Sequence, residues 1–151
     1  MPGYFKEDLT GNALEVIGRT VLFCHLRTLK IGLTQCDNVV SMCSGLHLLR
    51  DLQMLELFLF GPSSLVFCKL MEELGNKRTL QHLHLVLVDD EAAKHLSNMV
   101  KDNHTLQTLE LSHCNLTAAG SHMLFEAVKV NCNLTRLDNS GSYRLLELGY
   151  E

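Results

Sequence analysis

Two histidines and two glutamates are the residues of this chain whose types and spacing could support metal chemistry. His82 and His84 are separated by one residue, so on a β-strand they would lie on the same face, with Glu56 and Glu110 on the neighbouring strands. Imidazole and carboxylate groups are zinc ligands. The alternative is that these are solvated polar side chains, and we favour it because no metal-binding motif accompanies them. We therefore expect no metal and no cofactor.

A second candidate for chemistry is the adjacent pair His113 and Cys114. A cysteine nucleophile needs a base that is itself oriented by a third group, and the sequence indicates no such group. The pair is better interpreted as part of a turn. The chain also lacks the phosphate-binding pattern G-x-x-x-x-G-K-[ST]. With no catalytic constellation in view, we predict that the protein is not an enzyme.

A leucine pattern determines where these polar residues lie. The motif L-x-x-L-x-[LI] begins at Leu26, Leu52, Leu80 and Leu106, and a shortened copy begins at Leu134, so the starts are 26, 28, 26 and 28 residues apart. This period falls in the range of leucine-rich repeats, roughly 20–29 residues. Strands are therefore expected near 26–31, 52–57, 80–86, 106–111 and 134–138.

A helix is expected before each strand. Of the residues that stand ten and six positions before the five starts, all but Thr20 are apolar, and positions four apart share one helix face. Helices are predicted at about 37–49, at 64–75, from Asp89 or Asp90 to Asp102, and from Thr117 to Val130. The expected fold class is α/β: a leucine-rich-repeat solenoid, or partial horseshoe, with a parallel sheet on the concave face and helices on the convex face.

The repeat extends through one domain, residues 9–151, behind a loose lead-in at residues 1–8. Residues 9–23 have the pattern of a helix, yet no leucine motif precedes it. Either this helix caps the array, or the chain is a fragment of a longer parent with further repeats.

The array resembles the ribonuclease-inhibitor-like subfamily of leucine-rich repeats, whose units are near 28 residues long. The clearest unit is Leu106 to Asn133, and the resemblance covers about residues 9–138. Similar arrays occur in NLR-family immune receptors, tropomodulins and Ran GTPase-activating proteins. Only Cys114 matches the family's inward turn residue. Thr34, Phe60 and Val88 stand at that position in earlier units, where we expect less regular loops.

The resemblance implies a non-catalytic protein-interaction module, one interpretation being a piece of an NLR-like receptor. The alternative is a Ran-type GTPase-activating protein or regulatory subunit. Such proteins use an arginine in a loop after a strand, and here only Arg144, near the end of the chain, meets that condition. A structural fragment without a role of its own is a third possibility.

Composition narrows the partners and the compartment. The net charge of −4 argues against nucleic-acid binding, which favours a basic face. No apolar run is long enough for a membrane span. The six cysteines form no C-x-x-C pair and recur at repeat positions, so we interpret them as buried thiols rather than disulfides. Together with an N-terminus that lacks a signal peptide, this favours a reducing, cytoplasmic location.

The candidate binding surface is the outward row of the strands, which would bind an unidentified protein partner. Its middle column is mostly acidic and would suit a basic segment. Phe58 and Val86 would form an exposed apolar pair on neighbouring strands, unless Phe58 packs under the Gly61–Pro62 loop. The full set of candidate residues is Lys30, Met54, Glu56, Phe58, His82, His84, Val86, Glu110, Ser112, Arg136 and Asp138.

Overall fold

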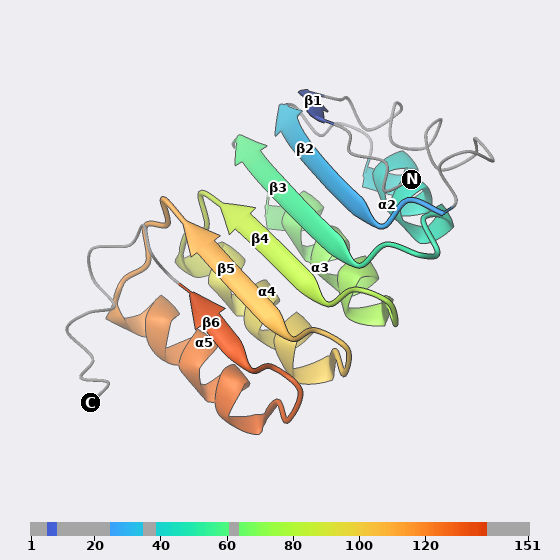
Figure 1. Cartoon of the computed structure of the whole chain (residues 1–151). Helices are drawn as coiled ribbons and strands as arrows, with labels where there is room; N and C mark the ends of the chain where they lie inside the picture. The colour runs from blue at the N-terminus through green and yellow to red at the C-terminus, as the bar shows by residue number, and fades with distance from the viewer. Residues whose placement is uncertain (1–5, 9–24, 35–38, 61–63, 139–151) are drawn as a thin grey trace.

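A computed structural model describes residues 6–8, 25–34, 39–60 and 64–138, and within these ranges the chain alternates between strand and helix. One sheet of six strands runs in chain order, and every neighbouring pair is parallel (Figure 1). The strands are β1 (Lys6–Asp8), β2 (Thr28–Thr34), β3 (Met54–Phe60), β4 (His82–Val86), β5 (Thr108–Ser112) and β6 (Arg136–Asp138).

The helices connect successive strands and lie on one side of the sheet (Figure 1). They are α2 (Val39–Leu48), α3 (Ser64–Asn76), α4 (Asp90–Asp102) and α5 (Ala118–Val130). Each helix packs on the next one along the chain. We call the other side of the sheet, where no labelled helix lies, the open face. The predicted fold class, an α/β leucine-rich-repeat solenoid with a parallel sheet, is confirmed.

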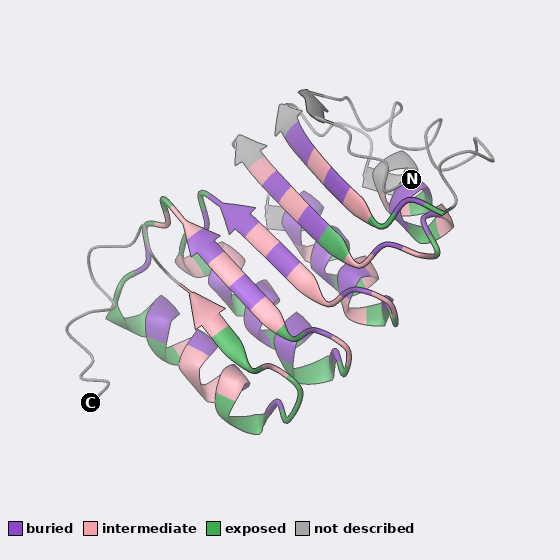
Figure 2. Cartoon of the chain, viewed as in Figure 1, coloured by how far each residue is buried: buried purple, intermediate pink, exposed green. Residues whose placement is uncertain are grey.

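The core lies between the sheet and the helices, and it is built from the repeated leucines. Leu29, Leu55, Leu83 and Leu109 come from the strands and are at most 1% exposed. They belong to one continuous hydrophobic cluster with leucines of the helices: Leu46, Leu70, Leu96 and Leu124. Burying one such side chain contributes roughly 1.5–3 kcal/mol. Along β3, β4 and β5 the leucines at alternate positions are therefore buried (Figure 2), and the residues between them face the open side.

The strand boundaries differ from the prediction in a regular way. β2, β3, β4 and β5 each begin two residues after the first leucine of the motif. That leucine is buried, but its backbone belongs to the loop: at the entry to β3, the amides of Gln53 and Met54 both donate to the Arg27 carbonyl, at 2.8 and 2.9 Å. The motif therefore marks the start of burial rather than the start of the parallel ladder.

The first strand was not predicted. Residues 1–8 were expected to be a loose lead-in, yet Lys6–Asp8 forms β1 and pairs with Lys30–Gly32 of β2. Backbone hydrogen bonds make this pairing, so it requires no leucine pattern. The helix predicted at 9–23 and the chain from residue 139 onward lie outside the described residues.

Helix starts and ends agree well with the sequence. Asp89 is the N-cap of α4 and accepts from the Ala92 amide at 2.9 Å, and Thr117 caps α5 by accepting from the Ala119 amide at 3.2 Å. α3 ends at Asn76, within one residue of the predicted end. Ser63 immediately precedes α3 and has a residue type that favours an N-cap, but it lies outside the described residues. No helix in the described part of the chain has the length and apolar character needed to cross a membrane.

The loops after the helices contain buried polar residues that link each repeat to the one before. Asn103 is fully buried; its side-chain nitrogen donates to the carbonyls of Leu74 and Lys77, and its side-chain oxygen accepts from the amides of Thr105 and Leu106. Asn131 repeats this arrangement one unit later. These hydrogen bonds satisfy carbonyls that a helix C-terminus otherwise leaves without partners.

Candidate protein-binding face

The middle column of the open face is assembled as the repeat register predicts. Lys30, Glu56, His84, Glu110 and Asp138 are direct neighbours on β2 to β6. Parallel strands lie about 4.8 Å apart, so side chains at matching places contact one another. The column is therefore one continuous row across the sheet.

Side-chain contacts link four strands along this column. Lys30 and His84 contact different oxygens of the Glu56 carboxylate; the Lys30 contact is an ion pair, and His84 Nδ1 lies 3.5 Å from Oε1. On its other side, His84 Nε2 is 2.8 Å from the Ser112 hydroxyl oxygen. Only 13% of the Glu56 side chain is exposed. The network thus fixes these side chains in place on an otherwise open surface.

The column is less acidic than its residue types suggest. Glu56 is paired with Lys30, and Asp138 accepts from Arg136 Nη2 at 2.7 Å. This hydrogen bond, then the charge of Asp138 and then that of Glu110, raise the pKa of Arg136. Within the described residues, Glu110 is the column's carboxylate that has no ion pair within 4 Å. The expected acidic strip is therefore reduced to one available carboxylate.

The predicted exposed apolar pair is wrong for Val86. Phe58 and Val86 are in register, as expected, but Val86 is only 6% exposed and Phe58 is half-buried. Val86 lies between Phe58 and Ser112 in register, so flanking side chains on both neighbouring strands can cover it. Met54, at the start of β3, is the exposed apolar residue of this face, at 38%. The Gly61–Pro62 loop lies outside the described residues.

The histidines are not arranged as a metal site. His82 is in register with Met54 and Thr108, away from both glutamates, and the ring of His84 already contacts Glu56 and Ser112. Across the described ranges, no three side chains of histidine, cysteine, aspartate or glutamate are grouped so that they could hold a metal ion.

Ser112, His84 and Glu56 lie in the order hydroxyl, imidazole, carboxylate, which is also the order of a nucleophilic relay. Here the carboxylate is shared with Lys30, and its 3.5 Å separation from His84 Nδ1 is longer than a hydrogen bond. The carboxylate is thus engaged mainly in an ion pair. We interpret the row as a fixed polar network.

His113 and Cys114 form part of a turn, as expected. His113 is exposed and adopts a positive φ of 52°, and the Cys114 thiol donates to the Ser112 carbonyl at 3.4 Å. The four described cysteines form no disulfide with one another, but the prediction that they are buried is wrong: Cys43, Cys68 and Cys114 are half-buried and Cys132 is exposed. Burial, then the charge of Glu73, raise the pKa of the Cys43 thiol. Arg144, the basis of the GTPase-activating alternative, lies outside the described residues.

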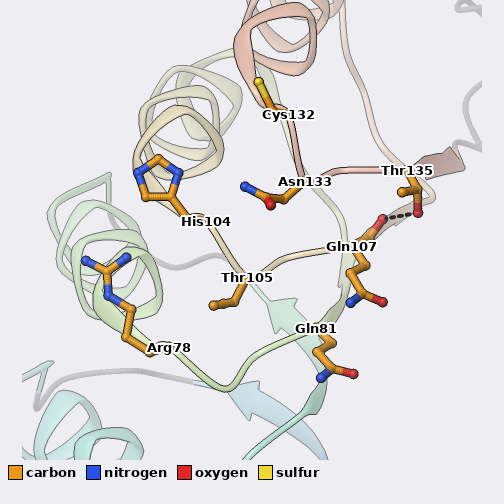
Figure 3. A pocket seen from close by; sticks show the side chains of 8 residues that line it. All are labelled: Arg78, Gln81, His104, Thr105, Gln107, Cys132, Asn133 and Thr135. Atoms are coloured by element: carbon orange, nitrogen blue, oxygen red, sulfur yellow. Dashed lines mark hydrogen bonds between the residues drawn. The ribbon is translucent and has the colours of Figure 1, made fainter.

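A polar pocket of about 440 Å³ opens beside the open face, at the edge where the strands begin (Figure 3). Arg78 and His104 extend from the loops after α3 and α4 on one side, and Gln81 and Gln107 lie on the other. Cys132 and Asn133 complete much of its wall. The leucine pattern does not predict this pocket. One feature of the sequence could have indicated it. The position two residues before the leucine motif is basic or histidine in three consecutive units, at Arg50, Arg78 and His104.

The fold and register together define a leucine-rich-repeat array. No protein-family model matches the chain. It is similar to the human protein "NACHT, LRR and PYD domains-containing protein 12", with 30% identity over 149 residues. That match covers 90% of this chain but only 14% of the length of the human protein.

Proposed function

We propose that this chain is a non-catalytic, cytoplasmic protein-binding module whose partner docks on the open face. The observation that supports the proposal best is the outward row of strand residues, which carries half-exposed and exposed side chains while the opposite face is buried under helices. Extended surfaces of this kind are what repeat arrays use for binding. The proposed face comprises the residues predicted above, apart from Val86, which is buried.

Two places on this face have the chemistry of contact points. Glu110 would accept a lysine or arginine of the partner, because its carboxylate has no ion pair within the described part of the chain. Met54 and half-buried Phe58 would supply apolar contact area on β3. An apolar contact beside a charged one is a usual arrangement in protein interfaces. The partner segment we propose is therefore basic, with an apolar side chain two strands away.

The similarity to a protein named for its LRR domains supports the interaction role. Because the match covers 14% of that protein's length, we propose that the present array corresponds to part of the repeat region of an NLR-like receptor. The ribonuclease-inhibitor-like subfamily remains the repeat type that we propose, on the basis of the period and the full outer helices.

Charge reversal on the open face tests the proposal. Glu110→Lys should reduce the recovery of a specific partner from cell extract at least about tenfold, since like charges would then face each other. Glu91→Lys makes the same charge change at an exposed position of α4, and it should leave recovery of the partner unchanged. The partner identified by mass spectrometry is then re-bound as a purified protein. If both variants bind it as the native chain does, the open face is not the docking surface.

A further inference from the structure

The pocket at the strand-entry edge has the lining of an anion site. Arg78 and His104 are exposed, and no carboxylate is among the residues that line the pocket. Among the described residues, Arg78 has no ion-pair partner within 4 Å. Its guanidinium therefore brings to the wall of the pocket a positive charge that no described carboxylate neutralises, on a chain whose net charge is −4.

Several polar atoms of the pocket wall already have hydrogen-bond partners. The Thr105 hydroxyl donates to the carbonyls of Lys77 and Leu80, and the Gln107 carbonyl accepts from the hydroxyl of Thr135 at 3.1 Å and from two backbone amides. The side-chain amides of Gln81 and Gln107 make no hydrogen bond that the described structure records. The pocket therefore offers a ligand the N–H donors of one guanidinium, together with side-chain amides that can donate or accept.

We propose that this pocket binds a carboxylate of an acidic peptide segment, as a second contact for the partner that docks on the open face. A guanidinium binds a carboxylate through two parallel hydrogen bonds, which fixes both position and charge. The volume of about 440 Å³ accommodates a small ligand or a few residues of peptide. The inference rests on the proposed function only for the identity of the partner.

The location supports a peptide ligand. Gln81 and Gln107 immediately precede His82 of β4 and Thr108 of β5, so the pocket adjoins the first residues of the open face. A single extended segment can place an acidic residue in the pocket and a basic residue near Glu110. The pocket thus adds a requirement that the open face alone does not impose: opposite charges at two points of the same partner.

Fluorescence polarisation with defined probes tests the pocket directly. The probes are a labelled oligoglutamate amide, a labelled serine–glycine peptide with a free C-terminal carboxylate, and a labelled oligoglutamine amide as the neutral control. Arg78→Ala should raise the Kd for the acidic probe by about tenfold or more, the usual effect of losing a hydrogen bond to a charged group. His104→Ala should raise it less.

The chain offers a matched control for charge. Arg50 occupies the same repeat position one unit earlier, is exposed and does not line the pocket. Arg50→Ala removes the same charge and should change the Kd by less than about twofold, as expected for screened charges at a distance.

Cys132 provides a readout of location. Its exposed thiol lines the pocket, so saturating oligoglutamate should slow the alkylation of Cys132 by iodoacetamide, measured by mass spectrometry, while half-buried Cys43 serves as a reference. The protection should disappear in the Arg78→Ala variant. Unprotected Cys132 at saturating probe would place the binding elsewhere and overturn the proposal.

The other outcomes of these experiments also support or overturn the proposed carboxylate site. Tight binding of either carboxylate probe, lost with Arg78→Ala, supports the proposal, and the preferred probe shows whether a side chain or a chain terminus supplies the group. Equal effects of Arg78→Ala and Arg50→Ala, or equal binding of oligoglutamine, would overturn it. Protection of Cys132 by inorganic phosphate but by neither acidic peptide would overturn it as well. Glu110→Lys should leave binding of the probes to the pocket unchanged. The pocket and the docking of a partner on the open face are therefore tested by different variants.

Discussion

The side-chain nitrogen of Asn131 donates to the backbone carbonyl of Asn103 at 2.8 Å, and Asn103 occupies the same place one repeat earlier. Asn103 in turn donates to the carbonyl of Lys77, its counterpart in the preceding unit, at 3.1 Å. Lys77 continues the series by donating from Nζ to the carbonyl of Leu49 at 2.5 Å. The repeats are therefore coupled by a buried polar ladder as well as by their leucines.

We predict that Asn103→Ala destabilises the fold on the order of 3 kcal/mol, because buried carbonyls and amides lose their partners. Urea unfolding measures this change. Asn133→Ala, at an exposed position two residues beyond Asn131, is the control and should stay within about 0.5 kcal/mol of the native chain. Equal stability of the two variants would mean that the ladder does not couple the repeats.

Lys77 should make stability depend on pH. Burial lowers the pKa of Lys77 below its ordinary value of 10.5. Between the lowered value and 10.5, the unfolded chain binds more protons than the folded one, so the free energy of unfolding rises with pH in that window. Below that pH window, Lys77 is protonated in both states, and the folded chain bears the full free-energy cost of burying the charge.

The measurement compares native protein with Lys77→Met by urea unfolding between about pH 7 and about pH 10. As pH rises, the free energy of unfolding of the native chain should increase relative to that of Lys77→Met. A difference that is constant, or that shifts the other way, would show that Lys77 is as well solvated in the fold as in the unfolded chain.

Close approach of α4 and α5 requires a glycine at position 120. Asp90 accepts hydrogen bonds from both the amide and the hydroxyl of Thr117, and a Cβ on Gly120 would lie 2.2 Å from Asp90 Oδ1. Gly120→Ala should therefore cost about 1–3 kcal/mol. In an Asp90→Ala background the same change should cost clearly less.

Gly75 supplies the comparison for that prediction. It also lies in a helix, but its added Cβ would meet Met99 Cγ at an ordinary 3.6 Å. Gly75→Ala should be neutral or stabilising by up to about 1 kcal/mol, through helix propensity. Thermal unfolding of both alanine variants checks the contrast, and a similar loss in the two would argue against the Asp90 contact as the cause.

The features that recur in every repeat could be predicted from the sequence. Leucine spacing predicted the parallel sheet and the register of Glu56, His84 and Glu110, because burial on one face repeats in every unit. The residue type of Thr117 predicted the start of α5. It missed β1, which pairs through the backbone without leucines. It also missed the neutralisation of Glu56 by Lys30 and the burial of Val86, since both depend on neighbours 26 to 28 residues away meeting on one face.

The polar row on β3 to β5 should not act as a nucleophilic relay. Because the Glu56 carboxylate is paired with Lys30, it does not polarise His84 strongly, and Ser112 should keep the low reactivity of an ordinary serine. A fluorophosphonate probe, followed by mass spectrometry, should leave Ser112 unlabelled. Labelling that disappears in Ser112→Ala or His84→Asn would instead reveal an activated hydroxyl.

Site-specific photo-crosslinking tests the docking proposal most directly. A photoreactive amino acid replaces half-buried Thr108 on the open face of β5 or, as the control, exposed Lys94 on α4. One partner should crosslink from position 108 and not from position 94, and Glu110→Lys should reduce the yield of that product at least about tenfold. Crosslinking from position 94 alone, or a product at 108 that survives Glu110→Lys undiminished, would contradict it.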